Sequence, residues 1–369
     1  MTYKVLIVDD SSFFQTRLKG IVNEHPELEV IGIAANGQEA IDKDEQLKPD
    51  VISMDYEMPF VDGVTAVRTI LSKRSVPIIM FSSMTYDGAR ITLDALDAGA
   101  VDFMPKNFAE VSGNSASMKK RFHEKLITFA RNAKPKPRLG STAVASAGSP
   151  STRAQPIPAA SSPARARMPA QKPIKAATKS IKGKIKLLII GASTGGPVAV
   201  SDIITKLPAE FPAPIVIVQH MPENFTRAFA ERLNRQSALN VKEADSGDRL
   251  AQGQVLVAPG GKQLMFERSG NSVRILPADE RINYKPSVDI SFGSAAQVFG
   301  DSVLSIMLTG MGSDGCEGAR LLKQAGAQLW AQNKETCVVY GMPAAVVNAD
   351  LADHVLPISQ FASKLTNEV

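Results

Sequence analysis

The chain has 369 residues, 44% hydrophobic and 21% charged, a composition that supports two domains with sizeable cores and excludes wholesale disorder. No apolar run approaches the roughly 20 residues that a membrane-spanning helix needs, and the first residues lack a signal-peptide layout. Only two cysteines, Cys316 and Cys337, are present, which excludes a disulfide framework and a four-cysteine zinc site. We therefore expect a cytoplasmic protein.

The formal net charge of +5 is unevenly distributed along the chain. Residues 131–186 include 13 Lys or Arg and no Asp or Glu, which leaves 29 basic against 37 acidic residues elsewhere. This basic stretch is rich in Ala, Pro and Ser, and it predicts a flexible linker over 133–183. Its diffuse charge without aromatic residues does not favour a nucleic-acid site, although transient contact with an acidic surface stays open.

Short apolar runs alternate with amphipathic stretches in the N-terminal part, which we assign to a domain over 1–125. The helical patterns begin near Ser11, Gly37, Gly63, Asp87 and Glu110. Continuous Val/Ile-rich runs between helices indicate a parallel sheet covered on both faces. The expected strands are 4–8, 29–34, 50–54, 76–81 and 100–104.

The same alternation recurs in residues 184–369, with a hairpin-like insertion at 262–278. The fold class is therefore α/β, with two doubly wound parallel-sheet domains joined by the linker. In open parallel sheets, chemistry collects beyond the carboxyl ends of the strands. The expected strands of this second domain are 186–191, 214–219, 254–259, 303–308 and 328–332.

Acidic side chains gather at the strand ends of the first domain. Asp9 and Asp10 follow its first strand, and Asp55 ends its third. Three carboxylates at one edge repel one another unless a hard cation such as Mg²⁺ joins them. Ser82 and Lys106, after the fourth and fifth strands, can contact a phosphoryl group. This pattern predicts phosphoryl transfer to Asp55, although helix capping explains any one of these residues alone.

This set, with Glu57-Met58-Pro59 and Asp62-Gly63 after Asp55, closely resembles the response-regulator receiver domain. The resemblance implies a flavodoxin-like fold and a phosphorylated Asp55. It also implies that Asp10, Asp55 and the backbone carbonyl of Glu57 hold Mg²⁺, with Asp9 supporting them.

Three further positions carry over from the receiver family. Ser82 and Phe103 match the hydroxyl and aromatic positions that change conformation on phosphorylation. Lys106 matches the phosphate-pairing lysine, but Pro105 precedes it here, whereas the family usually reads Lys-Pro.

In the second domain, residues 191–195 satisfy G-x-S-x-G, the pattern that places a serine on a sharp strand-to-helix turn. A phosphate-binding turn is the alternative interpretation of this segment. His220 follows the next strand directly, 27 residues after Ser193. Because neighbouring parallel strands end side by side, we expect Ser193 and His220 to lie within hydrogen-bonding reach.

A carboxylate, Asp314, follows the strand at 303–308 and could orient the imidazole of His220. Residues 310–315 also read G-x-G-x-x-G, which makes a dinucleotide site the main rival. The next strand ends in Ala-Gln-Asn without the carboxylate that binds a ribose, so we disfavour that reading. Cys316 is an alternative nucleophile that we expect to be buried in a helix.

The stretches GASTGGP, QHMP and LTGMGSDG, in this order behind a receiver, closely match the chemotaxis receptor protein-glutamate methylesterase (CheB) family. The resemblance implies a Rossmann-like methylesterase domain with the triad Ser193, His220 and Asp314. It places the oxyanion hole at the backbone N–H groups of Met311 and Thr194, and it implies no cofactor in the catalytic domain.

The resemblance also implies a phosphorylation-activated methylesterase and glutamine deamidase. Its substrates would be methyl-accepting chemotaxis receptors, and its phosphodonor a chemotaxis histidine kinase. We expect it to be peripheral to receptor arrays and to bind no nucleic acid. Two alternatives from other classes are a non-enzymatic response regulator and a nucleotide-dependent oxidoreductase.

Overall fold

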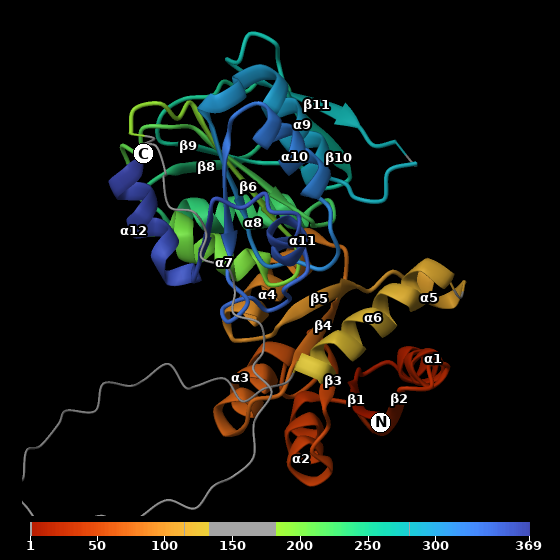
Figure 1. Ribbon diagram of the computed structural model, residues 1–369. Coiled ribbons are helices and arrows are strands. Elements are labelled where there is room, and N and C mark those ends of the chain that lie inside the picture. Colours follow the sequence, from red (N-terminus) through yellow and green to blue (C-terminus); the bar gives the residue numbers. More distant parts are fainter. Residues whose placement is uncertain (1, 114, 133–181, 280) are drawn as a thin grey trace, which may run out of the picture.

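The computed structural model describes residues 2–113, 115–132, 182–279 and 281–369. Apart from residues 182 and 183, the predicted linker over 133–183 lies outside the described residues. Two main sheets, both entirely parallel, confirm the predicted fold class (Figure 1). Within the described ranges, no helix is long and apolar enough to cross a membrane.

The N-terminal domain is built on a five-stranded sheet in the order β2-β1-β3-β4-β5. Buried apolar residues from α2, α3 and α4 cover one face of this sheet, and those from α1, α5 and α6 cover the other. The strands are β1 (Tyr3–Val8), β2 (Leu28–Ala34), β3 (Val51–Asp55), β4 (Ile78–Ser82) and β5 (Asp102–Pro105). The helices are α1 (Ser12–Asn23), α2 (Gly37–Leu47), α3 (Gly63–Lys73), α4 (Tyr86–Asp97), α5 (Phe108–Ser112) and α6 (Ala116–Asn132).

The helix expected from Glu110 is in fact two helices. Asn107 caps the short α5, because its side chain accepts hydrogen bonds from Ala109 N and Glu110 N. Gly113 ends α5 after five residues, and α6 starts afresh at Ala116.

The C-terminal domain has a seven-stranded sheet in the order β14-β13-β12-β6-β7-β9-β8 and a separate antiparallel hairpin, β10-β11. The hairpin matches the predicted insertion. The strands are β6 (Leu187–Ala192), β7 (Ile215–Gln219), β8 (Asn240–Glu243), β9 (Gln254–Val257), β10 (Lys262–Phe266), β11 (Val273–Pro277), β12 (Val303–Met307), β13 (Gln328–Gln332) and β14 (His354–Leu356).

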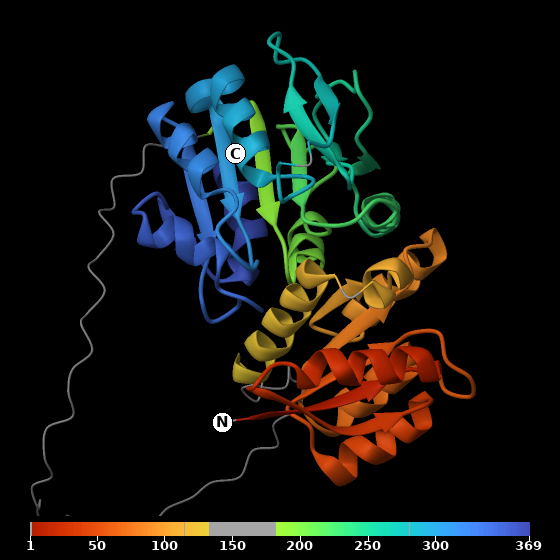
Figure 2. The same cartoon turned by 90° about the vertical axis from the view of Figure 1, so that its right-hand side faces the viewer.

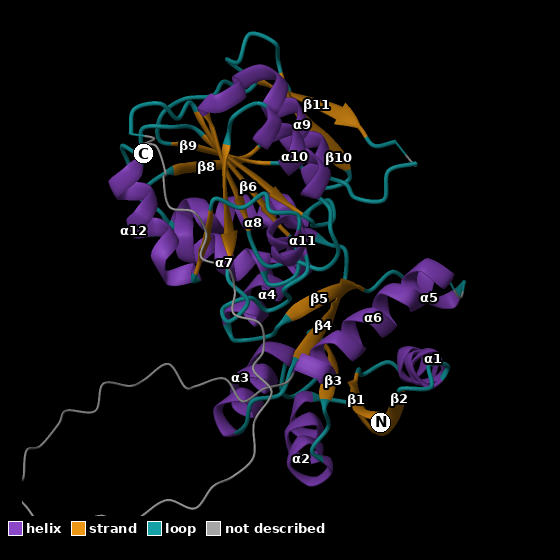
Figure 3. Cartoon of the chain, in the orientation of Figure 1, coloured by secondary structure: helices purple, strands orange, loops and turns teal. Residues whose placement is uncertain are grey.

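Helices cover both faces of this larger sheet, which fans out between them in Figure 3. Buried residues of α7, α8 and α12 pack on one face, and those of α9, α10 and α11 pack on the other. The helices are α7 (Gly196–Ile204), α8 (Phe225–Gln236), α9 (Val288–Phe299), α10 (Cys316–Gln324), α11 (Met342–Asn348) and α12 (Ile358–Glu368), with a 3₁₀ turn at Gly300–Ser302.

The two domains are in contact. Figures 1 and 2 both show the N-terminal domain, red to yellow, against the end of the C-terminal domain that carries α7 and α8. Helix α4 packs on α8 and also touches α7. One apolar cluster runs through both domains, from the α4 side of the first sheet to the α7 and α8 side of the second.

Candidate active site and phosphoacceptor site

The centre of the larger sheet brings the three predicted catalytic residues to one edge. Strand β6 lies between β12 and β7, so the segments after these three strands are neighbours. Ser193 follows β6, His220 follows β7, and the backbone N–H of His220 donates to Ala192 O at 3.0 Å. On the other side, the N–H of Ser193 donates to Thr309 O at 3.1 Å, beyond the end of β12.

The turn at Ser193 depends on two glycines. Gly195 has φ +75°, a left-handed conformation that glycine adopts without strain, and it begins α7. Gly196 packs so tightly that a Cβ there would lie 2.0 Å from Gln219 Oε1. The amide of Gln219 donates to Ser193 O at 2.8 Å and so fixes the turn. Ser193 is thereby held at the N-terminal end of a helix, where a developing negative charge is stabilised.

His220 and Asp314 form a direct pair, in which His220 Nε2 lies 2.7 Å from Asp314 Oδ2. The other ring nitrogen, Nδ1, is buried and has no hydrogen-bond partner among the described residues. The Ser193 hydroxyl likewise has no hydrogen bond to any of the described residues. With a proton on Nε2 for Asp314, Nδ1 keeps a lone pair that can accept a proton.

Asp314 is held at the beginning of α9. Its carboxylate accepts hydrogen bonds from Val288 N at 2.7 Å, Asp289 N at 3.2 Å and Ser287 Oγ at 2.9 Å. Burial alone would raise the pKa of Asp314, but the bonds from His220, Val288 and Ser287 outweigh it and lower the pKa below its ordinary value. The carboxylate is therefore ionised and able to stabilise an imidazolium.

The loop that carries Met311 passes directly beside Ser193. A Cβ on Gly310 would lie 2.9 Å from the Cβ of Ser193, so only glycine allows this approach. Thr309, directly before Gly310 in the same loop, donates from Oγ1 to the carbonyl of Thr194 at 2.9 Å. Both predicted oxyanion-hole residues therefore belong to segments that touch the serine or its neighbour.

The rival interpretations find less support in this geometry. A dinucleotide site is disfavoured because Asp314, within the Gly310–Gly315 loop, is bound to His220. The buried Gln332, at the end of β13 where a ribose would bind, accepts a hydrogen bond from Thr309 N at 2.8 Å. Cys316 lies at the start of α10, half-buried, and burial raises the pKa of its thiol. A raised thiol pKa opposes the formation of a nucleophilic thiolate.

The second site lies at the strand ends of the N-terminal domain. Carboxylate oxygens of Asp9, Asp10 and Asp55 all lie within 4.8 Å of one another. Lys106 Nζ lies 2.6 Å from Asp55 Oδ2 and 2.8 Å from Asp9 Oδ2. Ser82 is buried beside this group, and its hydroxyl has no hydrogen-bond partner among the described residues.

The charges at this site are incompletely balanced. Burial raises the pKa of Asp55 to about 6, against the opposing effect of Lys106 and with a further increase from Asp9. Burial also raises the pKa of Asp9. One ammonium group thus faces three carboxylates, of which Asp10 is exposed. Oxygen ligands with this excess of negative charge and access to water suit Mg²⁺.

Phe103 and Glu57 occupy different positions around this site. The ring of Phe103 stacks on Phe225 of the other domain, with centroids 4.6 Å apart and planes at 1°. The backbone N of Glu57 lies 3.4 Å from Asp55 Oδ1, which places this residue beside the candidate phosphoacceptor.

Polar contacts between the domains extend to the turn that carries Ser193 and Thr194. Thr194 Oγ1 donates to Asp102 Oδ2 at 2.9 Å, and both side chains are buried. Asn224 Nδ2 donates to Met84 O at 3.1 Å, and Arg232 on α8 forms ion pairs with both Asp94 and Asp97 on α4. The sequence carries no signal for these contacts, because each residue alone has the pattern of a solvated helix or strand end.

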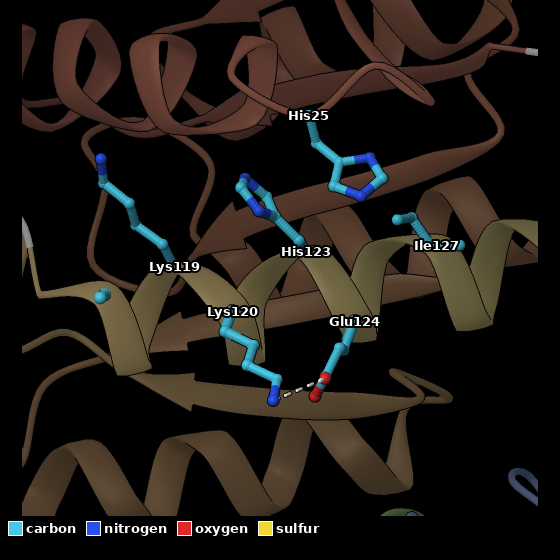
Figure 4. Close-up of a pocket in the computed structure, with 7 residues that line it drawn as sticks. His25, Lys119, Lys120, His123, Glu124 and Ile127 are labelled. Atoms are coloured by element: carbon cyan, nitrogen blue, oxygen red, sulfur yellow. Dashed lines mark ion pairs between the residues drawn. The ribbon is translucent and has the colours of Figure 1, made fainter.

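A cavity of about 400 Å³ lies elsewhere, between α6 and the segment before β2 (Figure 4). His25 and His123 line it, with ring centroids 5.2 Å apart. Each has a structural hydrogen bond: His25 Nδ1 accepts from Glu27 N, and His123 Nε2 contacts Ile21 O at 2.6 Å. Neither His25 nor His123 lies on the catalytic-domain sheet that carries Ser193, so neither is a candidate for the base.

Comparison with known proteins agrees with this division of the chain. Residues 5–114 match the family model of the response regulator receiver domain, and residues 188–365 match that of the CheB methylesterase. The fold and the two sites thus define a response regulator with an enzymatic output domain.

Relatives that match over the whole chain identify the family more specifically. The chain is 63% identical over 369 residues to protein-glutamate methylesterase/protein-glutamine glutaminase 1 of Saccharophagus degradans, and the match covers 100% of both chains. It is 50% identical to the protein of the same name in Vibrio cholerae, and that match covers 100% of this chain and 99% of the relative. The crystal structure of the Thermotoga maritima CheB methylesterase catalytic domain is 43% identical, with a TM-score of 0.48 and coverage of 50% of this chain and 99% of that one. This chain belongs to the protein-glutamate methylesterase/protein-glutamine glutaminase family.

Proposed function

We propose that this chain hydrolyses glutamate methyl esters and deamidates glutamines on methyl-accepting chemotaxis receptors, with Ser193 as the nucleophile. The observation that carries the proposal is the hydrogen bonding of the two ring nitrogens of His220. Its Nε2 is bound to Asp314, and its buried Nδ1 is free at the strand end next to Ser193. Whole-chain membership of the family supports the choice of substrate.

The reaction follows from these positions. Ser193 Oγ attacks the γ-carbonyl carbon of the ester while its proton passes to His220 Nδ1. The backbone N–H groups of Met311 and Thr194 stabilise the oxyanion, and the ionised Asp314 stabilises the imidazolium. The imidazolium then gives its proton to the leaving oxygen as the carbon–oxygen bond breaks, and methanol departs.

Water completes the cycle. His220 removes a proton from a water molecule as its oxygen attacks the acyl carbon. The imidazolium then returns that proton to Ser193 Oγ as the acyl–oxygen bond breaks, and glutamate leaves. The same sequence on a glutamine side chain releases ammonia in place of methanol, because only the leaving group differs. No cofactor is needed in this domain.

The N-terminal domain would act as a switch. Asp55 would accept a phosphoryl group from a chemotaxis histidine kinase, with Lys106 and Ser82 contacting the phosphoryl oxygens and Asp9 supporting the site. Asp10, Asp55 and the carbonyl of Glu57 would hold Mg²⁺, which supplies neutralisation of the phosphoryl charge.

Regulation would operate through the contact between the domains. The receiver covers the turn at Thr194 and packs Phe103 on Phe225, so a large receptor substrate would be kept from Ser193. Phosphorylation at Asp55 would shift the population toward an undocked form, since only a differential effect on the two forms can move their equilibrium.

The test is methanol release from methylated receptor membranes, with and without a small phosphodonor such as acetyl phosphate. We expect wild-type release to rise with the phosphodonor and Ser193→Ala to release at least about 10³-fold less, as for other triad nucleophiles. Ser201→Ala, in the same helix α7, is the matched control and should behave like wild type. Undiminished release by Ser193→Ala would refute the proposed nucleophile.

A further inference from the structure

Tyr284 lies flat against the imidazole of His220. Their ring centroids are 4.4 Å apart and the planes are inclined by only 12°. The phenol is 39% exposed, so one of its faces covers the histidine and the rest of the ring borders solvent. Its hydroxyl reaches the neighbouring glycine loop, where a Cβ on Gly312 would lie 3.0 Å from Tyr284 Oη.

The backbone of Tyr284 is fixed by one buried side chain. Gln263 on β10 donates from Nε2 to Tyr284 O at 2.8 Å, and its Oε1 accepts from Ser287 N at 2.8 Å. Gln263 is 3% exposed, so these bonds are shielded from water. The segment from Tyr284 to Ser287 is therefore anchored at both ends to the hairpin strand.

The stacked ring of Tyr284 restricts the orientation of the imidazole of His220, which the hydrogen bond to Asp314 alone does not fix. A single hydrogen bond at Nε2 leaves the imidazole free to pivot about that bond, and pivoting would move Nδ1 away from Ser193. An aromatic ring parallel to the imidazole opposes this motion, because contact between the two ring faces is lost when the imidazole pivots. The stack also shields one face of the ring from water.

The same segment positions the other half of the pair. Ser287 Oγ and the backbone N–H of Val288 bind the carboxylate of Asp314. Residues 284–288 therefore touch His220 through a ring and Asp314 through hydrogen bonds. This short segment, which follows the hairpin, fixes the relative orientation of both residues.

We infer that Tyr284 is a positioning residue for the hydrolytic reaction, acting through its ring on His220 and not through its hydroxyl. This inference rests on the proposed role of His220 as the base. It predicts that loss of the ring lowers kcat, because the base is misaligned, and leaves KM nearly unchanged.

The experiment compares Tyr284→Leu, Tyr284→Ala and Tyr284→Phe in the full chain by methanol release with phosphodonor present. We expect kcat to fall by roughly 10- to 100-fold in the Leu and Ala variants, with KM within about threefold, as misplacement of a catalytic group by about 1 Å produces. Tyr284→Phe should stay within about threefold of wild type. Tyr3→Leu, on β1 of the other domain, is the control for loss of a tyrosine ring.

A proton NMR measurement separates positioning from general loss of structure. The downfield signal of the proton between His220 Nε2 and Asp314 should persist in Tyr284→Phe and broaden in Tyr284→Leu, while the melting temperatures of the two variants stay similar. Wild-type kcat in Tyr284→Leu, or a Tyr284→Phe variant as slow as Tyr284→Leu, would overturn the inference. Full activity of the Ser193→Ala variant would instead overturn the proposed function on which this inference rests.

Discussion

Asp55 is a buried carboxyl whose ionisation lowers the stability of the protein. Its carboxyl is buried beside Asp9, and its pKa of about 6 lies above the ordinary value of 3.8. The folded protein therefore binds this proton more tightly than the unfolded chain does. As pH rises from about 4 to above 6, the contribution of Asp55 to the free energy of unfolding falls, by roughly 3 kcal/mol at most.

Removal of this charge should stabilise the protein at neutral pH. We expect Asp55→Asn to raise the free energy of unfolding by roughly 1–3 kcal/mol at pH 7.5 without Mg²⁺, and to have little effect at pH 4, where the wild-type carboxyl is protonated. Urea unfolding at the two pH values measures the difference. Asp42→Asn, at an exposed position on α2, is the control for removal of a surface carboxylate. Equal effects of Asp55→Asn at both pH values would contradict the explanation.

At the scale of single residues, the sequence was informative where chemistry coincides with a strand end. Ser193, His220 and Asp314 could be predicted as neighbours because parallel strands end at one edge. Residues that act from another element could not be predicted in this way. Tyr284 and Gln263 belong to a hairpin and its following loop, whose position over the sheet depends on packing and not on local pattern.

At the scale of elements, the strands that were missed are the two edge strands of the larger sheet. Strand β8 has four residues, two of them charged, and β14 has three, so neither shows the apolar run of a central strand. Each is formed by pairing with a neighbour, β9 or β13, and not by its own propensity. The predicted central strands, buried on both faces, agree with the structure to within two residues at most ends.

Helix α9 links a structural cap to the proposed chemistry. Ser287 is its N-cap, accepting from Ile290 N, and the same hydroxyl donates to Asp314. We expect Ser287→Ala to lower the free energy of unfolding by about 1 kcal/mol, as other cap deletions do, and to reduce kcat about tenfold because Asp314 loses a partner. Unfolding curves and methanol release measure the two effects.

A second capping residue provides the control for that experiment. Asn36 caps α2 by accepting from Glu39 N at 2.9 Å, far along the chain from the catalytic loops. Asn36→Ala should therefore have a similar effect on stability and none on kcat. If both variants lost the same fraction of activity, the effect of Ser287 would be one of general stability and not of its bond to Asp314.

At the scale of the whole molecule, the contact between the domains depends strongly on Arg232. Its side chain is 14% exposed, and its guanidinium pairs with Asp94 and Asp97 across the interface. A charge pair at a largely covered position contributes more than an exposed one, and removal of one partner leaves the others unpaired. The docked form should be the one that loses stability.

Arg232→Ala should therefore raise methanol release without phosphodonor by several-fold and reduce the further stimulation by phosphodonor. Arg235→Ala, three residues further along α8 at an exposed position, removes the same charge outside the contact and should leave both values unchanged. Unaltered basal release by Arg232→Ala would mean that docking does not limit access to Ser193.

Strand β5 joins the two sites over a very short path. Lys106, directly after the strand, pairs with Asp55, and Asp102, its first residue, binds Thr194 beside the proposed nucleophile. Four strand residues span only about 13 Å. Motions on that scale take far less than a second, whereas a phosphorylated aspartate persists until it is hydrolysed. Under the proposed function, the duration of receptor demethylation would follow the lifetime of an acyl phosphate at Asp55, and the chemistry of that residue would time the response.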